Sequence, residues 1–337
     1  MRILILGGLG FIGSHTAAAL RHQGHSVGVL DCFHQYNSIP DGEYFNVLAQ
    51  RKAFASPDHI FEGRIEDESY LKKVFAEYRP EVVLHLATYP NARMVQRDAV
   101  DATNNMVGGT RKVLAACTAH RVRRLVFASS SMVYGEFGAR VPNEKSRTRP
   151  KTQYGILKLE GEKLCRRMAR KTGLELVILR PSALYGPRDI IVRVISHMAI
   201  DCVRHGRITV QGENRKLDFS FVEDVAQAFV LAALHPDASG QTFNCTRGRG
   251  RTLLEAAEIV RATLGYGFIE LQEAETFYPS RGTLDSDKLK ALGWDPSIDI
   301  ESGIPAYLQW FLEQDHVRHA GSSFEGTSAL ATQPRPM

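Results

Sequence analysis

Short apolar runs alternate with helix-like stretches along the first half of the chain. Runs with the length of buried strands lie at 2–6, 25–30, 81–87, 124–131, which ends in three serines, and 175–179. Stretches with helical periodicity lie between them, at 14–21, 68–78, 101–120 and 152–171. The segment 32–64 is polar and irregular, with one helix expected at 44–52. Strands that alternate with helices predict an α/β fold: a Rossmann-type, doubly wound parallel sheet, whose ligands bind beyond the carboxyl ends of the strands.

A glycine-rich turn links the first strand to the first helix and reads Gly7-Gly-Leu-Gly10-Phe-Ile-Gly13. Gly7 permits a tight turn, Gly10 lets the backbone approach a pyrophosphate, and Gly13 allows the helix to pack closely on the strand. The free N–H groups and the dipole of the helix start then favour negative charge. Asp31 ends the second strand, where a carboxylate can accept both adenosine ribose hydroxyls and would repel a 2′-phosphate. The sequence therefore favours NAD over NADP.

Tyr154 and Lys158 lie four residues apart in the helix-like stretch 152–171, so their side chains leave from one face. An ammonium near a phenol favours the phenolate. We therefore expect Lys158 to lower the pKa of Tyr154 and make it a usable base near neutral pH. Ser130 belongs to a serine run that follows the fourth strand, and its hydroxyl is a third candidate at the same edge of the sheet. By itself, such a tyrosine–lysine pair is also typical of a solvated helix edge.

Composition narrows the class of protein further. The chain has 337 residues, 44% of them hydrophobic, and a net charge of +5 without a long basic run, which argues against a nucleic-acid partner. Its five cysteines share no metal-ligand or redox spacing, so we expect no metal site and a reducing, cytoplasmic location. No apolar stretch is long enough to cross a bilayer, so no membrane association is expected. The segment 315–337 lacks periodicity and is expected to be a disordered tail.

Taken in order, these residues resemble the extended short-chain dehydrogenase/reductases, specifically the NAD-dependent epimerase/dehydratase group that acts on nucleotide sugars. The resemblance runs from residue 1 to about 311 and includes Ser129-Ser-Ser-Met-Val-Tyr-Gly135 and Tyr185-Gly-Pro187. It implies that Tyr154, Lys158 and Ser130 are catalytic. It implies NAD contacts by Gly7, Gly10, Phe11, Ile12, Gly13, Asp31, Ile65, Leu86, Ala87, Ser129, Tyr154, Lys158 and Pro181. The substrate contacts that it implies are Ser130, Tyr154, Ala183, Arg188, Val210 and Arg281.

The resemblance also implies a domain organisation. We expect an NAD-binding Rossmann domain at 1–180, to which a later segment, about 218–245, returns. A smaller C-terminal substrate-binding lobe is expected at 181–217 and 246–314, with a helix at 190–205. A homodimer is expected to form through the helices near 101–120 and 152–171.

Some positions depart from the family pattern. Ala183 stands where the family usually has Asn, and Leu217 where it usually has Arg, and both commonly touch the substrate diphosphate. Leucine cannot make the charge-assisted contacts of arginine, so Arg281 or Arg188 is expected to hold the phosphates instead. The segment 63–67 reads Gly-Arg-Ile-Glu-Asp instead of the family's Gly-Asp-x-x-Asp, which leaves adenine to backbone and Ile65 contacts. Met132 replaces the acidic residue of the dehydratase and decarboxylase branches and cannot exchange a proton.

The function implied is an NAD-dependent epimerase of a nucleotide-activated sugar, acting at C4 through a transient 4-keto intermediate. One alternative is an NAD(H)-dependent dehydrogenase or reductase of a sugar-like substrate, which need not carry a nucleotide diphosphate. Another is a non-catalytic NAD-binding module that senses redox state.

Overall fold

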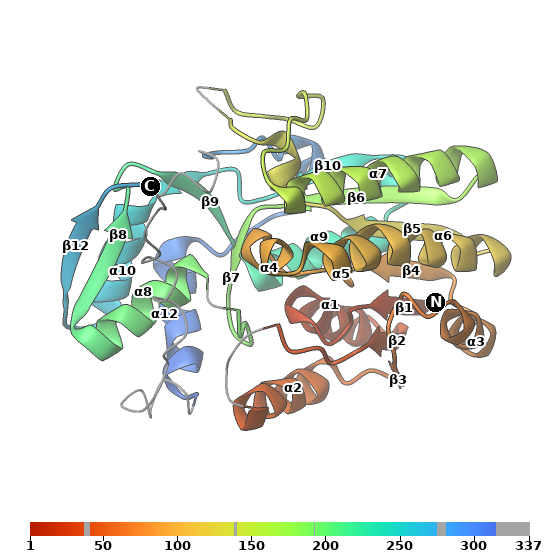
Figure 1. Cartoon of the computed structure of the whole chain (residues 1–337), viewed down its shortest axis with the longest axis horizontal. Helices are drawn as coiled ribbons and strands as arrows, with labels where there is room; N and C mark the ends of the chain where they lie inside the picture. The colour runs from red at the N-terminus through yellow and green to blue at the C-terminus, as the bar shows by residue number, and fades with distance from the viewer. Residues whose placement is uncertain (37–40, 138–139, 192, 275–280, 315–337) are drawn as a thin grey trace, which may run out of the picture.

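The computed structural model describes residues 1–36, 41–137, 140–191, 193–274 and 281–314 (Figure 1). Its centre is a sheet of seven strands in the order β10-β6-β5-β4-β1-β2-β3, and all neighbouring strands are parallel. The strands are β1 (Arg2–Leu6), β2 (Ser26–Asp31), β3 (His59–Glu62), β4 (Val82–His85), β5 (Arg124–Ala128), β6 (Glu175–Pro181) and β10 (Thr242–Cys245). The doubly wound sheet expected from the apolar runs is confirmed.

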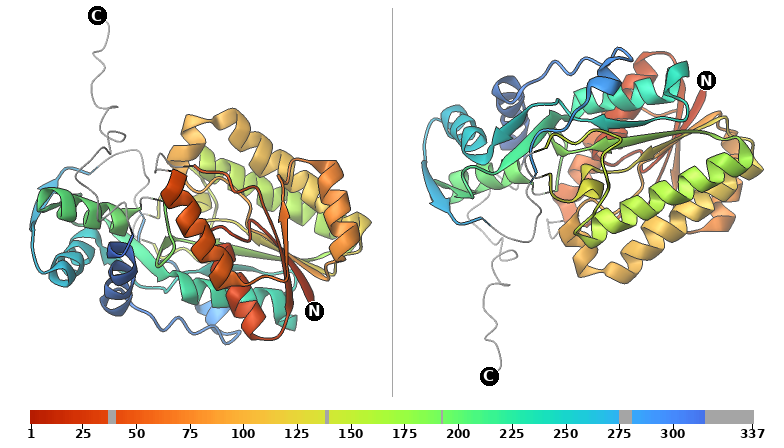
Figure 2. Two further views of the ribbon diagram at one scale, coloured as in Figure 1. Left: turned by 90° about the horizontal axis from the view of Figure 1, so that it is seen from below. Right: turned by 90° about the horizontal axis from the view of Figure 1, so that it is seen from above.

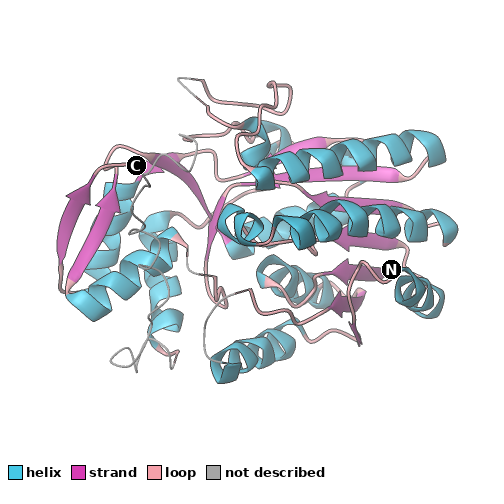
Figure 3. Cartoon of the chain, viewed as in Figure 1, coloured by secondary structure: helices cyan, strands magenta, loops and turns pink. Residues whose placement is uncertain are grey.

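Helices cover both faces of this sheet (Figure 3). One face packs against α1 (Phe11–His22), α2 (Asp41–Ala55) and α9 (Val222–Leu234). The other packs against α3 (Glu68–Tyr78), α6 (Thr110–Ala119) and α7 (Gln153–Thr172). Within β1, Ile3 and Ile5 join the first core and Leu4 and Leu6 the second, because successive side chains point to opposite faces. Both faces of the strand are therefore buried.

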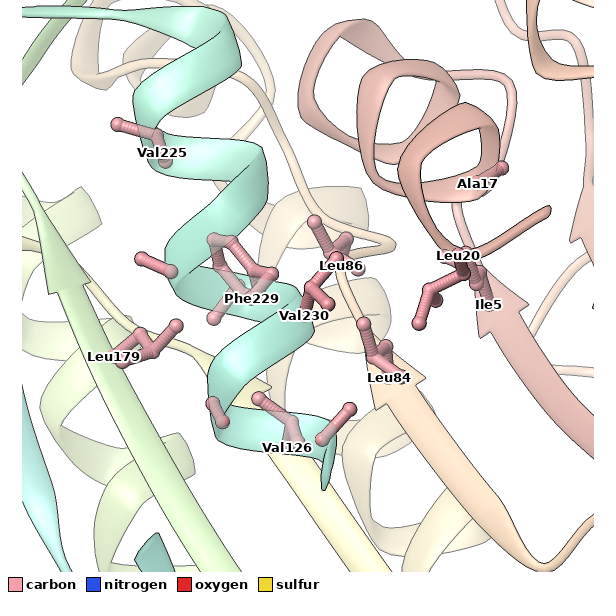
Figure 4. Packing of buried hydrophobic residues seen from close by; sticks show 14 of the residues in the cluster. Ile5, Ala17, Leu20, Leu84, Leu86, Val126, Leu179, Val225, Phe229 and Val230 are labelled. Carbon is pink, nitrogen blue, oxygen red and sulfur yellow. The ribbon is translucent and has the colours of Figure 1, made fainter. Parts of the chain in front are cut away.

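The first of these two cores joins distant parts of the chain. Phe229 and Val230 of α9 lie against Leu84 of β4 and Leu179 of β6, with Leu20 of α1 nearby (Figure 4). The strand β10 follows α9 and pairs with β6 at the edge of the sheet. The chain thus returns to the large sheet after forming part of the smaller lobe.

Two features of the Rossmann half differ from the sequence expectation. The polar segment between β2 and α3 contains a further parallel strand, β3, which pairs with β2. The helix expected at 101–120 is divided into α5 (Ala99–Thr103), a π-helical segment η1 (Asn104–Gly109) and α6. A Cβ on Gly109 would lie 2.6 Å from Cδ1 of Ile65, so the glycine permits a close contact between this segment and Ile65.

A smaller lobe lies beside the large sheet, at the end away from the N-terminus (Figures 1 and 2). It contains the three-stranded sheet β11-β9-β7 and the strand pair β12-β8. Its core gathers Tyr185, Phe219, Phe221 and Tyr307. The strands of the lobe are β7 (Ala183–Tyr185), β8 (Arg207–Gln211), β9 (Lys216–Phe221), β11 (Gly250–Thr252) and β12 (Phe268–Gln272).

The lobe also carries α8 (Val194–His205), α10 (Leu253–Leu264) and α12 (Ile300–Leu312). The helix expected to start at Ile190 therefore starts at Val194, which leaves Arg193 in the N-cap position. The remaining short elements are α4 (Ala92–Arg97), η2 (Ser131–Tyr134), η3 (Pro236–Ala238) and α11 (Asp287–Lys290). The expected tail, 315–337, lies outside the described residues. No helix in the described part of the chain could span a membrane.

Candidate active site

The glycine-rich turn forms a backbone cradle at the carboxyl end of β1. Gly7 has φ +78°, and a Cβ there would lie 2.7 Å from the nitrogen of Ala87. A Cβ on Gly13 would lie 2.2 Å from the carbonyl oxygen of Gly7. Gly10 caps α1 without any side chain, so the first N–H groups of the helix face outward from bare backbone. This shape and this positive helix end fit a diphosphate, which is the central part of NAD.

Asp31 lies at the end of β2, beside this cradle. Its Oδ2 accepts the N–H of Leu9 at 2.9 Å, and its Oδ1 accepts the N–H of Phe33 at 3.0 Å. Burial raises the pKa of Asp31, and these N–H donors oppose the shift. A carboxylate has about four acceptor positions, so two ribose hydroxyls can still bind. The hydrogen bonds from Leu9, in the glycine-rich turn, and from Phe33 therefore fix the position of the Asp31 carboxylate.

Ser130, Tyr154 and Lys158 come together at the carboxyl end of β5. Thr152 caps α7 by accepting the N–H of Gly155 at 3.2 Å, which fixes Tyr154 in the first helical turn. A Cβ on Gly155 would lie 2.6 Å from the carbonyl oxygen of Met132, so α7 packs directly on the serine segment. The Ser130 hydroxyl is consequently close enough to Tyr154 to act on its pKa, which it lowers.

Lys158 approaches Tyr154 from the adjoining turn of α7. Its Nζ lies 5.7 Å from the centre of the Tyr154 ring and donates to the carbonyl oxygen of Ala128 at 2.7 Å. Burial lowers the pKa of Lys158 to about 7. The group can therefore exchange a proton near neutral pH.

The electrostatics of Tyr154 differ from the sequence expectation. Burial raises the pKa of Tyr154, opposed by the charges of Arg193 and Arg281 and by the hydrogen bond from Ser130. Lys158 was expected to lower this pKa, but it is not among the groups that do so. The physical reason is that the fully buried Lys158 is itself hard to keep charged.

Two arginines therefore belong to the surroundings of Tyr154. Arg281 donates from Nη1 to the hydroxyl of Ser131 at 3.3 Å, next to Ser130. Arg193 lies at the start of α8, and its Nε binds Oδ2 of Asp189 at 2.7 Å. Arg281 was expected from the sequence. Arg193 was missed because the helix was expected to start before it.

A buried glutamate on α7 forms hydrogen bonds close to Ser130 and Lys158. Glu162 lies one turn beyond Lys158 and accepts the Ser129 hydroxyl at 2.6 Å. It also accepts Nε and Nη2 of Arg180, at 2.7 and 2.6 Å. Arg180 in turn donates to the Tyr134 hydroxyl at 2.8 Å. This network ties α7, β6 and the serine segment together, and the spacing of Glu162 from Lys158 was the signal that could have revealed it.

The model of one known protein family matches most of the chain. It is described as "NAD dependent epimerase/dehydratase family" and matches residues 3–246. The chain belongs to this family. The family is NAD-dependent, and the shape and charge of the glycine cradle beside Asp31 fit this cofactor. The described residues include no group of His, Cys, Asp and Glu that could hold a metal ion.

Similar proteins cover nearly the whole chain. A UDP-glucose 4-epimerase of Halalkalibacterium halodurans is 27% identical, over 94% of this chain and 97% of its own length. A UDP-glucose 4-epimerase of Mycolicibacterium smegmatis is 29% identical, over 92% and 98%. The crystal structure of a Thermus thermophilus UDP-glucose 4-epimerase in complex with NAD has a TM-score of 0.80 and 28% identity, and it covers 93% of this chain and 99% of that chain.

Several of the residues expected to contact the cofactor are buried in the structure. Phe11 and Leu86 are nearly covered, and Pro181 ends β6. Ile65 is packed against Gly109. Ser129 is nearly buried and donates its hydroxyl to Glu162. Ile12 and Ala87 keep partial exposure beside the glycine turn.

The expected substrate positions separate into two groups. Ala183, in β7, is partly exposed at the junction with the smaller lobe. Arg188 stacks its guanidinium on the ring of Phe54 of α2, 3.7 Å from the ring centre, and is not among the charges that act on Tyr154. Val210 has no exposed surface and belongs to the core of the smaller lobe. Arg281 acts on Tyr154, whereas Arg188 stacks on α2 and Val210 lies in the core of the smaller lobe.

Proposed function

We propose that the protein is an NAD-dependent epimerase that inverts C4 of a nucleotide-activated sugar through a transient 4-keto intermediate. The observation that carries this proposal is the meeting of Ser130, Tyr154 and Lys158 beside the glycine cradle. The UDP-glucose 4-epimerases of two other organisms, aligned over nearly their whole lengths, support the substrate class. UDP is therefore the first nucleotide to test.

Each side chain has a defined task in this reaction. Tyr154 takes the proton of the C4 hydroxyl and later returns it, while Ser130 hydrogen-bonds the same oxygen. NAD, when bound, supplies the acceptor and then the donor of the C4 hydride. Lys158 binds the cofactor ribose and, when protonated, favours the phenolate of Tyr154. Proton and hydride both return to the sugar, so the reaction consumes no NAD.

Methionine at position 132 supports epimerisation over elimination. Met132 lies in η2, is nearly buried, and follows Ser130 by two residues. Its thioether can neither give nor take a proton, so no acid stands there to assist the loss of a hydroxyl. The site retains the tyrosine base alone, which suffices for oxidation followed by reduction.

The anionic group of the substrate must be bound by another cationic residue, because Leu217 stands where the family usually has arginine. Arg281 and Arg193 fulfil this task, since both act electrostatically on Tyr154 and come from the segments that border the smaller lobe. Guanidinium groups bind phosphate and carboxylate through paired hydrogen bonds. A sugar diphosphate or a uronic acid would suit them.

The expected assembly and location belong to the same proposal. The protein forms a homodimer through α6 and α7, which pack side by side on one face of the sheet. All five cysteines are free thiols, which is typical of proteins of the cytoplasm. Light scattering of the purified protein tests the dimer, and a monomeric mass would contradict it.

Incubation with UDP-, GDP-, dTDP-, ADP- and CDP-sugars, followed by NMR, tests the reaction. The C4 epimer of at least one sugar should form while the absorbance of NADH stays constant. A steady rise or fall of that absorbance would instead support net oxidation or reduction, the alternative that Ala183 and Leu217 leave open. Absence of any conversion across the panel would contradict the proposal.

A further inference from the structure

A buried arginine lies behind the glycine cradle. The helix α2 buries Tyr44, Val47, Leu48, Arg51 and Ala55, the spacing of an apolar core stripe. Arg51 is only 6% exposed. Burying a cation without a directly bound carboxylate is costly, and burial lowers the pKa of Arg51. An arginine at such a position calls for a compensating partner.

The described hydrogen bonds of Arg51 all go to neutral backbone carbonyls. Its Nη1 donates to Leu9 at 3.2 Å. Its Nε and Nη2 donate to Arg188, at 3.0 and 2.6 Å. Arg188 has φ +68°, which L-residues rarely adopt, so this carbonyl is presented to Arg51 at some backbone cost. The guanidinium thus joins the glycine turn to the loop that leads into the smaller lobe.

The nearest carboxylates are already engaged by other groups. Asp31 and Asp189 both act on Arg51 through space. Asp31, however, accepts the N–H groups of Leu9 and Phe33, and Asp189 pairs with Arg193 at 2.7 Å. The positive charge of Arg51 therefore has no carboxylate in direct hydrogen-bond contact within the described residues.

Leu9 connects this charge to the cofactor cradle. Its N–H is bound by Asp31 and its carbonyl by Arg51, so the two peptide groups that flank the Leu9 Cα are each held by one hydrogen bond. Gly10 is the N-cap of α1, where the helix dipole already favours an anion. The buried cation and the helix end consequently add positive potential at the same place, with little screening by water.

We propose that Arg51 is a buried countercharge for the diphosphate of NAD and a positioning residue for the glycine turn. It acts from behind the turn, through Leu9, without touching the phosphates. The inference rests on NAD binding and not on which sugar is turned over, so it can be tested without any substrate. The negative charge of a bound diphosphate would complete the neutralisation of Arg51. This attraction raises the affinity for ligands that carry a diphosphate.

Calorimetric titration of nucleotide-free protein distinguishes the effect of the Arg51 charge from the effect of its contacts on the shape of the site. Arg51→Lys and Arg51→Gln both lose the double contact with the two carbonyls, but only the lysine keeps the charge. ADP-ribose and adenosine serve as the probes, because they share the adenine and its ribose and differ in the diphosphate and the terminal ribose attached to it. Arg21→Gln is the matched control, since Arg21 lies at the far end of α1 and pairs with Asp58.

The proposal predicts that Arg51→Gln binds ADP-ribose about tenfold more weakly than Arg51→Lys does, equivalent to about 1.4 kcal/mol. Adenosine should bind the two variants within about twofold, and Arg21→Gln should match the wild type for both ligands. Equal ADP-ribose affinities of the lysine and glutamine variants would overturn the proposal. An equally large loss for adenosine would also overturn it, because it would show a role in shape alone.

A second measurement needs no variant and holds even if Arg51→Gln does not fold. A buried countercharge is little screened, so the wild-type affinity for ADP-ribose should change less than about threefold between 0.05 and 0.5 M salt. A steep fall with salt would show that exposed cations hold the diphosphate, and it would overturn the proposal.

Discussion

Lys158 lies one helical turn from Tyr154, with its Nζ 5.7 Å from the centre of the tyrosine ring and 2.7 Å from the carbonyl oxygen of Ala128. The lysine is thus fixed by the end of β5 and not by the phenol. Burial lowers its pKa to about 7, whereas burial raises the pKa of Tyr154. In the cofactor-free protein, neither group is held in its charged form by the other.

This burial predicts a pH dependence of stability in the NAD-free protein. The pKa of Lys158 falls from 10.5 to about 7 on folding, so the unfolded chain binds more protons between these values. Unfolding free energy should therefore rise with pH from about 7 to 10, by more than about 1 kcal/mol, relative to Lys158→Met. Urea titrations of both proteins across this range measure the difference. A pH-independent difference would show that Lys158 is readily protonated in the fold.

The Glu162–Arg180 pair is expected to be essential for folding stability. Both side chains are almost fully buried, and Glu162→Gln would leave the Arg180 charge without its carboxylate. Removing one partner of a buried pair costs about 3–5 kcal/mol. Denaturant unfolding should show this loss for Glu162→Gln. Glu160→Gln, on the same helix in an exposed pair with Lys163, should change the free energy by less than about 0.5 kcal/mol. Similar small effects for both variants would contradict the role of Glu162.

Asp31 is expected to determine the choice of cofactor. Its carboxylate is buried at the end of β2 and would repel the 2′-phosphate of NADP. Asp31→Asn should lower the ratio of NAD to NADP affinity by about tenfold or more, because the repulsion disappears while the acceptor oxygen remains. Titration of both cofactors measures the ratio, and Asp58→Asn, in a surface pair, is the control. An unchanged ratio would show that residues other than Asp31 determine the selectivity between NAD and NADP.

The sequence predicted the cofactor half of the molecule in more detail than the substrate half. Gly7, Gly10, Gly13 and Asp31 could be recognised because a tight turn and a diphosphate demand a short, fixed pattern. The strand β3 was missed because His59–Glu62 buries only Phe61 and so lacks a clear apolar pattern. The π-helical turn at Asn104–Gly109 depends on packing against Ile65, which no local pattern encodes.

The charges around Tyr154 show most clearly what could not be predicted from the sequence. Its neighbour in sequence, Lys158, was expected to lower its pKa. Burial instead raises this pKa, and the charges of Arg193 and Arg281 oppose the rise from the smaller lobe and its border. Such contacts arise from how the chain returns across the sheet, over more than a hundred residues in the case of Arg281. The burial of Arg51 could not be predicted for a related reason. Polar and apolar residues are mixed along α2, and this pattern does not indicate which polar side chain is buried.

Arg193 is expected to act on substrate binding. It lies at the start of α8 and contributes positive charge at Tyr154. Arg193→Gln should raise KM for the nucleotide sugar by about tenfold, the value of one lost charge-assisted contact, with a smaller change in kcat. Bound NAD should stay at the wild-type level. Arg207→Gln, on the exposed side of the same lobe, is the control. An unaltered KM would remove Arg193 from the substrate site.

The most direct test of the account compares turnover of wild-type protein with that of Tyr154→Phe, on a sugar nucleotide that the wild type epimerises at C4. The variant keeps the ring and its packing but cannot take the hydroxyl proton, so turnover should fall by at least about a hundredfold. Its bound NAD should remain at the wild-type level. A Tyr154→Phe protein that retains more than about one hundredth of the wild-type turnover would contradict the assignment of Tyr154 as the catalytic acid and base.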